Sequence, residues 1–111
     1  MSKFDEKIAL YQGAMKDLGI SFNADLFAKV TKGLGPSIYK KDAETVSGSD
    51  AKELATVKNN FLIKKLGLSD GAKLDNAIDA VMEKMGKSNR NKYRAIVYYL
   101  LVKELGQESK Y

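Results

Sequence analysis

The sequence predicts an all-α protein, a compact single domain of about five helices spanning residues 1–111, with the C-terminal helix at its centre. Two observations predict this fold. Apolar residues recur at three- and four-residue steps, which is the spacing of one helix face. Phrases ending in Gly-x-Ser separate these periodic segments, and 111 residues suit one domain. The phrases centre on Gly19, Gly35, Gly67, Gly86 and, in a looser copy, Gly106.

Each position of this phrase suits the end of one helix and the start of the next. A lysine in the last turn faces the negative end of the helix dipole, and the glycine takes the left-handed conformation that closes a helix. The serine two residues later is expected to cap the following helix by accepting a hydrogen bond from its first turn. The phrase therefore predicts helix boundaries and carries no chemistry.

Three helices are predicted in the first two thirds of the chain. The first covers residues 3–18, and the second, with Asn23 as its candidate cap, runs to Leu34, where a Gly-Pro pair prevents continuation. Residues 37–48 are expected to form a loop with one short helical turn capped by Asp42. The third helix is expected to start at a Ser49 cap and to end at Leu66. Its inward residues are predicted to be Leu54, Val57, Phe61 and Leu62.

The fourth and fifth helices differ in how their apolar residues are distributed. The fourth has a narrow apolar face made of Leu74, Ile78, Val81, Met82 and Met85, and a separate acidic ridge made of Asp75, Asp79 and Glu83. From Tyr93 to Val102 only Arg94 is charged, so the fifth helix is expected to lie at the centre of the bundle. If neighbouring helices did not cover it fully, Tyr98, Tyr99 and Val102 would form a patch suited to another subunit.

The composition excludes several kinds of functional site. The chain has no cysteine and no histidine, which excludes disulfides, thiolate and imidazole catalysis, and the usual zinc and haem sites. Its start lacks the apolar stretch of a signal peptide, and its longest apolar run, residues 95–102, is too short to span a bilayer. We therefore expect a cytoplasmic protein that has no cofactor and does not contact a membrane.

Acidic residues offer weak candidates for other chemistry. Asp42, Glu44, Asp50 and Glu53 match four positions of a calcium loop, but Val46 occupies a ligand position, so ordinary caps and loop charges are the preferred interpretation. No spacing singles out a Ser-Lys, Tyr-Lys or paired-carboxylate site. The expectation is a protein that is not an enzyme and binds no metal.

The net charge of +5 is concentrated in one stretch. No acidic residue interrupts its five basic residues, and the remaining basic residues equal the acidic ones in number. Together with the amides of a helix start they could bind an anion. The predicted anion site comprises Lys84, Lys87, Ser88, Arg90, Lys92 and Arg94. The alternative is a solvated helix end whose cations pair with acids such as Glu83 or Asp79.

Three stretches of the chain carry a family resemblance. Residues 35–39 (GPSIY), 60–68 (NFLIKKLGL) and 85–95 (MGKSNRNKYRA) resemble the bacterial family catalogued as domain of unknown function 2853, over nearly the whole chain. The resemblance implies a small, stand-alone bacterial protein. It implies no activity, ligand or functional residue.

These observations favour a non-enzymatic binding module that meets an anionic partner through residues 84–94. Nucleic acid is one such partner, and we would expect contacts to its phosphates more than to base edges, because the fifth helix lacks the exposed polar face of a recognition helix. The alternative is a structural or protein-interaction module, a homodimer formed through the C-terminal helix.

Overall fold

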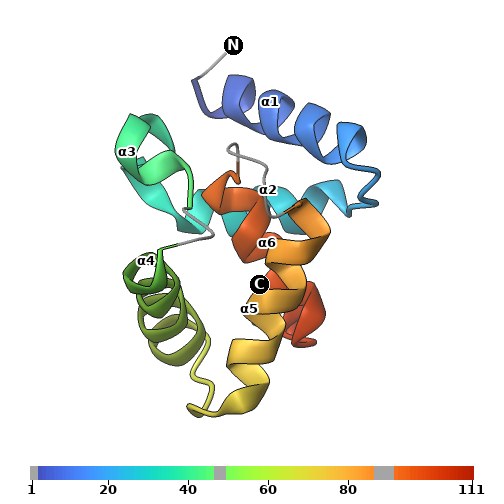
Figure 1. Cartoon of the computed structure of the whole chain (residues 1–111). Coiled ribbons are helices and arrows are strands. Elements are labelled where there is room, and N and C mark those ends of the chain that lie inside the picture. Colours follow the sequence, from blue (N-terminus) through green and yellow to red (C-terminus); the bar gives the residue numbers. More distant parts are fainter. Residues whose placement is uncertain (1–2, 47–49, 87–91) are drawn as a thin grey trace.

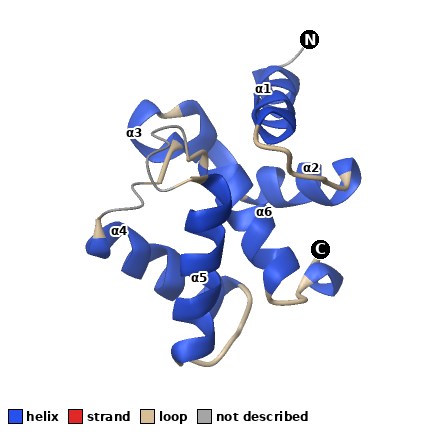
Figure 2. Ribbon diagram, turned by 45° about the vertical axis from the view of Figure 1, so that its right-hand side comes forward, coloured by secondary structure: helices blue, strands red, loops and turns tan. Residues whose placement is uncertain are grey.

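The computed structural model describes residues 3–46, 50–86 and 92–111. Within these ranges the regular structure is helical, and the sole β-type pairing is an isolated bridge between Thr45 and Tyr93. Figures 1 and 2 show the helices gathered around one central element, α6. The predicted all-α class is confirmed.

Five main helices are present in the described part of the chain, as predicted. They are α1 (Lys3–Asp17), α2 (Ala24–Gly33), α4 (Ala51–Thr56) with its π-helical continuation η2 (Val57–Lys65), α5 (Ala72–Met85) and α6 (Arg94–Glu104). The shorter elements are the 3-10 helix η1 (Gly35–Tyr39), the four-residue helix α3 (Lys41–Glu44) and the 3-10 helix η3 (Glu108–Lys110). The brief helix expected near Asp42 is therefore also present.

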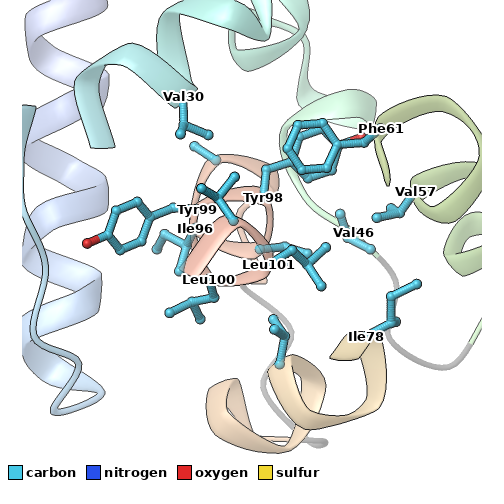
Figure 3. Packing of buried hydrophobic residues seen from close by; sticks show 14 of the residues in the cluster. Val30, Val46, Val57, Phe61, Ile78, Ile96, Tyr98, Tyr99, Leu100 and Leu101 are labelled. Atoms are coloured by element: carbon cyan, nitrogen blue, oxygen red, sulfur yellow. The ribbon is translucent and has the colours of Figure 1, made fainter. Parts of the chain in front are cut away.

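Helix α6 lies at the centre of the bundle, between α5 and α2 (Figure 2). Every residue from Ala95 to Val102 is buried, because a helix that is apolar on all sides needs neighbours on all sides. Figure 3 shows its side chains leaving the helix in different directions, with Tyr98 beside Phe61 and Leu101 on the side of Val57. The predicted central position of this helix is confirmed.

The central position of α6 also decides whether its tyrosines form a surface patch. Tyr98, Tyr99 and Val102 are 7%, 1% and 0% exposed, so the other elements of the same chain cover them. The Tyr99 hydroxyl accepts a hydrogen bond from the backbone amide of Asn23 at 2.7 Å, which fixes the start of α2 against α6. The condition for a subunit-binding patch on this helix is not met.

The glycine of each repeated phrase has the predicted positive φ, although Gly86, with a ψ of 118°, does not adopt the left-handed helical conformation. Gly19, Gly35, Gly67, Gly86 and Gly106 all have positive φ, between 64° and 90°. These values lie in the region that glycine adopts without steric strain from a Cβ atom. The helix ends predicted at these glycines are therefore confirmed.

The predicted role of the serine as a helix cap is wrong in the first three copies of the phrase. Helix α2 is capped by Asn23, whose side chain accepts from the Leu26 amide, while Ser21 lies two residues too early. Ser37 lies inside η1 and donates its hydroxyl to the Leu34 carbonyl, because the Gly-Pro pair has already started a 3-10 turn. Ser69 does not cap α5 either, because the residue before that helix is Gly71 and no side chain caps this end. Ser88 lies outside the described residues.

Two further caps differ from the prediction. Asp42 lies within α3, which begins after Lys40 without a side-chain cap, so its predicted capping role is wrong. Helix α4 is capped by Asp50, whose carboxylate accepts from the Lys52 amide at 2.9 Å. The cap is therefore one residue later than predicted, and Ser49 itself lies outside the described residues.

Candidate binding cleft around Arg94

The first residue of α6, Arg94, makes three hydrogen bonds to other parts of the fold. Its Nε donates to the Ala43 carbonyl of α3 at 2.7 Å, and its Nη1 donates to the Tyr98 hydroxyl one turn further along α6 at 3.0 Å. Its Nη2 lies 2.5 Å from Oε1 of Glu53 in α4. The guanidinium thus joins the start of the central helix to two other helices.

The environment of Arg94 stabilises its positively charged form. Burial opposes the charge, but the hydrogen bond to Tyr98 and the ion pair with Glu53 outweigh burial and raise the pKa of Arg94 above its ordinary value. The guanidinium carbon also lies 5.6 Å from the centre of the Tyr98 ring, within the range of a cation–π contact. The side chains of Arg94 and Glu53 remain 12% and 28% exposed, so this charge stays accessible from solvent.

A cleft with a volume of about 390 Å³ opens beside Arg94. The second cation in its wall is Lys65, from the last turn of η2. Neutral hydrogen-bonding groups complete its polar lining. They are Ser37, Thr56, Asn60, Tyr98 and Tyr111. The cleft therefore combines two cations with several hydroxyl groups and one amide.

The apolar part of the cleft lining comes from α2, the residue that follows it, and η2. Val30 comes from α2, Leu34 follows the same helix, and Phe61 comes from η2. The Phe61 ring stacks on the Tyr98 ring with centroids 3.9 Å apart and planes at 18° (Figure 3). Both rings line the cleft, although they are only 4% and 7% exposed.

The π-helical winding of η2 brings its polar residues to the cleft. An α-helix turns by roughly 100° per residue, so Thr56 and Lys65, nine positions apart, would lie on opposite faces of one. A π-helix closes hydrogen bonds over one more residue and so holds more residues per turn. The observed bond from the Leu66 amide to the Phe61 carbonyl has this five-residue span, and both Thr56 and Lys65 line the cleft.

The C-terminal segment closes one side of the cleft. The Lys110 ammonium donates to the Leu66 carbonyl, which attaches η3 to the end of η2. Burial and the neighbouring Tyr98 raise the pKa of Tyr111, so its phenol is a neutral donor at physiological pH. Gly33 leaves room here, since a Cβ atom at its position would lie 3.6 Å from the Lys65 ammonium and 3.8 Å from the Tyr111 ring.

The short helix α3 is held in place from its other side by Glu44. Its carboxylate accepts from the Tyr11 hydroxyl at 2.6 Å and from the Lys7 ammonium at 2.7 Å, both in α1. Next to α3, the Val46 amide donates to the Lys92 carbonyl at 2.7 Å. These bonds fix the Ala43 carbonyl that receives Arg94, and so fix one wall of the cleft.

Three residues of the predicted anion site are described, and their surroundings differ. Lys84 is exposed at the end of α5, Lys92 is buried with 3% exposure, and Arg94 faces the cleft. These cations therefore do not share one solvent-facing surface. The remaining predicted members, Lys87, Ser88 and Arg90, lie outside the described residues.

The partner of Arg94 is also different from the acids named from the sequence. Asp79 and Glu83 are exposed on α5, whereas Arg94 pairs with Glu53, 41 residues away. The third acid of that ridge, Asp75, shares the Lys58 ammonium with Asp70. For Arg94, sequence proximity therefore suggested the wrong carboxylates.

Three of the four acids of the possible calcium loop have other partners. Glu44 binds Tyr11 and Lys7, Glu53 binds Arg94, and Asp50 caps α4. Among the residues that the structure describes, no three acidic side chains gather as metal ligands would. No described helix is both long and apolar enough to cross a bilayer.

Several cleft residues were missed by sequence reasoning. From the sequence, Lys65 is expected to be an ordinary cation in the last helical turn, and Tyr98 is expected to be a core residue. Tyr111 follows the last predicted helix, where no pattern applied. A signal was nevertheless present, because the stretches 35–39, 60–68 and 85–95 supply Ser37, Lys65 and Arg94, which meet at one cleft.

Comparison with known proteins gives the family and no close relative. A search of curated proteins found no match to the chain. A protein-family model described as "Protein of unknown function (DUF2853)" matches residues 10–109 of the 111. This match includes the cleft residues from Val30 to Tyr98 and the helices that position them. The chain therefore belongs to the DUF2853 family.

Proposed function

We propose that this protein is a non-enzymatic binding module that holds an anionic partner in the cleft around Arg94. The observation that carries the proposal is the charge balance at the cleft. Arg94 and Lys65 both line it, and Glu53 neutralises only Arg94. The charge in excess is that of Lys65, an exposed residue in the cleft lining, and it attracts an anion to the cleft.

Hydrogen-bond donors support the same function. The Tyr98 oxygen accepts from Arg94, so the hydroxyl proton of Tyr98 stays available for a ligand. The guanidinium of Arg94 carries more N–H donors than its three named bonds use. Tyr111 adds a neutral phenol and Asn60 an amide. Such donors bind a carboxylate or phosphate oxygen well.

The chemistry of these groups favours binding over catalysis. A general base must be poised to accept a proton near neutral pH. The raised pKa of Tyr111 makes its phenol a poor base there, and the pKa of Arg94 is higher still. The groups at the cleft are thus suited to hold an anion and unsuited to take a proton from it.

The test compares two neighbouring lysines. Both are exposed residues of η2, but Lys65 lines the cleft and Lys64 does not. We expect calorimetric titration with small carboxylates and phosphates to detect binding. Lys65→Glu should weaken that binding at least about tenfold, and Lys64→Glu should leave it within about twofold. Failure of every anion to bind, or equal loss in both variants, would refute the proposal.

A second candidate function uses the basic residues that begin at Lys84. Lys84 is exposed and begins the segment that continues through Lys87 and Arg90, so a polyanion such as nucleic acid could be contacted there. Binding to a mixed-sequence oligonucleotide should then weaken steeply with salt. It should also weaken in the triple variant Lys84→Ala, Lys87→Ala, Arg90→Ala but not in Lys65→Glu. Absence of binding at low salt would eliminate this candidate.

A further inference from the structure

We infer that the ligand of the cleft is a small aromatic monocarboxylate. This inference rests on the proposed function and adds the charge, shape and size class of the anion. Three observations select the class: the single excess charge, the aromatic wall and the volume of the cleft.

The charge balance selects a monoanion over a dianion. Glu53 Oε1 lies 2.5 Å from Arg94 Nη2 and offsets that cation, so Lys65 supplies the one charge in excess. A carboxylate neutralises this excess. A phosphate monoester carries a second negative charge near neutral pH, and the described lining residues hold no further cation for that charge. The site therefore discriminates against phosphate by unpaired charge.

The wall selects a planar apolar body. Phe61 and Tyr98 stack on each other at 3.9 Å and are 4% and 7% exposed, so a ligand meets only the small parts of these rings that line the cleft, next to Val30 and Leu34. Planar rings pack against such a wall by offset or edge-to-face contact, and their burial removes apolar area from water. An anion without an apolar body, such as acetate, would leave this wall hydrated.

The size of the cleft sets an upper limit on the ligand. Its volume of about 390 Å³ lies near the low end of the range found for small-molecule sites. One or two fused rings with a carboxylate suit such a space. The mouth between Gly33, Lys65 and Tyr111 is open because Gly33 has no side chain. We place the carboxylate at Lys65 and the ring against Phe61.

The inference can be tested with four probes, three of which each differ from 2-naphthoate in one feature. They are 2-naphthoate, 2-naphthyl phosphate, 2-naphthalenemethanol and acetate. The chain contains no tryptophan, so naphthalene fluorescence can be followed without tryptophan emission. We expect 2-naphthoate to bind at least about tenfold more tightly than each of the other three, as one well-placed charged hydrogen bond or one buried ring would give.

Two variants locate the binding. Lys65→Glu should weaken 2-naphthoate at least about tenfold, with Lys64→Glu as the matched control. Gly33→Leu places a side chain at the mouth, against Lys65 and Tyr111, and should block 2-naphthoate without changing the charge. The φ of Gly33 lies outside the positive region, so leucine there introduces no backbone strain. Circular dichroism melting confirms folding of each variant, and Gly33→Leu tests the site even if Lys65→Glu does not fold.

Each outcome decides a different statement. If 2-naphthyl phosphate binds as tightly as 2-naphthoate, the monoanion inference is wrong while the proposed function stands. If acetate binds as tightly as 2-naphthoate, the inference that the ligand carries an aromatic ring is wrong. If 2-naphthalenemethanol does so, the carboxylate is not recognised and both statements fail. Binding that survives both Lys65→Glu and Gly33→Leu would place the site elsewhere and would also overturn both.

Discussion

The Nη2 atom of Arg94 lies 2.5 Å from Oε1 of Glu53 and so joins the first turn of α6 to α4 across 41 residues of sequence. Arg94 therefore has two tasks. It holds the central helix against α3 and α4, and it contributes positive charge to the cleft. A cation at a helix start is unfavourable for the helix dipole, and these partners offset that cost.

Removal of either partner should destabilise the fold. Arg94→Ala leaves the Glu53 carboxylate partly buried without its cation and removes the bond to the Ala43 carbonyl. We expect a loss of about 2–3 kcal/mol in the free energy of unfolding, measured by urea denaturation. Lys84→Ala, on the exposed end of α5, serves as control and should stay within about 0.5 kcal/mol.

The double variant then isolates the pair. Arg94→Ala combined with Glu53→Gln should cost less than the sum of the two single changes, with a coupling of about 0.5–3 kcal/mol. Additive losses would mean that the ion pair contributes nothing beyond the separate contacts of each residue.

The buried phenol of Tyr11 should make stability fall in alkaline solution. Burial and the hydrogen bond to Glu44 raise its pKa far above the ordinary 10.0, so the folded protein keeps a proton that the unfolded chain loses above about pH 10. The unfolded state then binds fewer protons, and stability declines as pH rises, by up to about 1.4 kcal/mol per pH unit for this one group. Below about pH 9 this contribution is fully present.

Tyr11→Phe separates the two effects of that hydroxyl. At neutral pH the loss of the hydrogen bond to Glu44 should cost about 1–2 kcal/mol. Between about pH 9 and pH 11 the variant should lose less stability than the parent, because phenylalanine does not titrate. Denaturation curves at several pH values give both numbers. A Tyr11→Phe variant with the parent's slope would contradict the explanation.

Two glycines near each other in α1 and its C-terminal turn should respond oppositely to alanine. A Cβ atom at Gly13 or at Gly19 would meet no atom within 4 Å, so space does not distinguish them. Gly13 lies inside α1, where alanine should stabilise by about 0.5–1 kcal/mol. Gly19 has a φ of +71°, where alanine should destabilise by about 1–2 kcal/mol. Thermal melts of both variants measure the difference, and changes of the same sign would contradict the assigned conformations.

The cap of α2 offers a matched pair of polar residues. Asn23 accepts the Leu26 amide, so Asn23→Ala should cost about 1 kcal/mol. Ser21, which the repeated phrase names as the cap, lies two residues before it and is exposed. Ser21→Ala should therefore change the free energy of unfolding by less than about 0.5 kcal/mol. A larger loss at Ser21 than at Asn23 would restore the serine assignment.

Local patterns in the sequence determined the helices, their apolar faces and the glycines that end them. Each of these depends on contacts within one or two turns, as at Leu74 and Ile78 in α5 or at Gly19 after α1. The almost wholly apolar stretch after Arg94 likewise determined that the last helix is central. The choice among nearby cap residues was less secure, because Ser21, Asn23 and their neighbours compete within one turn.

Only the tertiary structure decided where the charges go. Glu53 and Lys65 reach Arg94 or its cleft from segments that are remote in the sequence, and no local period records such a meeting. The π-helical turn of η2 also changes which residues share a face, so an α-helical projection misplaces Lys65. Arg94 could be found from the sequence as an unusual cation at a helix start. Its role as the link between the bundle and the cleft follows from the partners that folding brings to it.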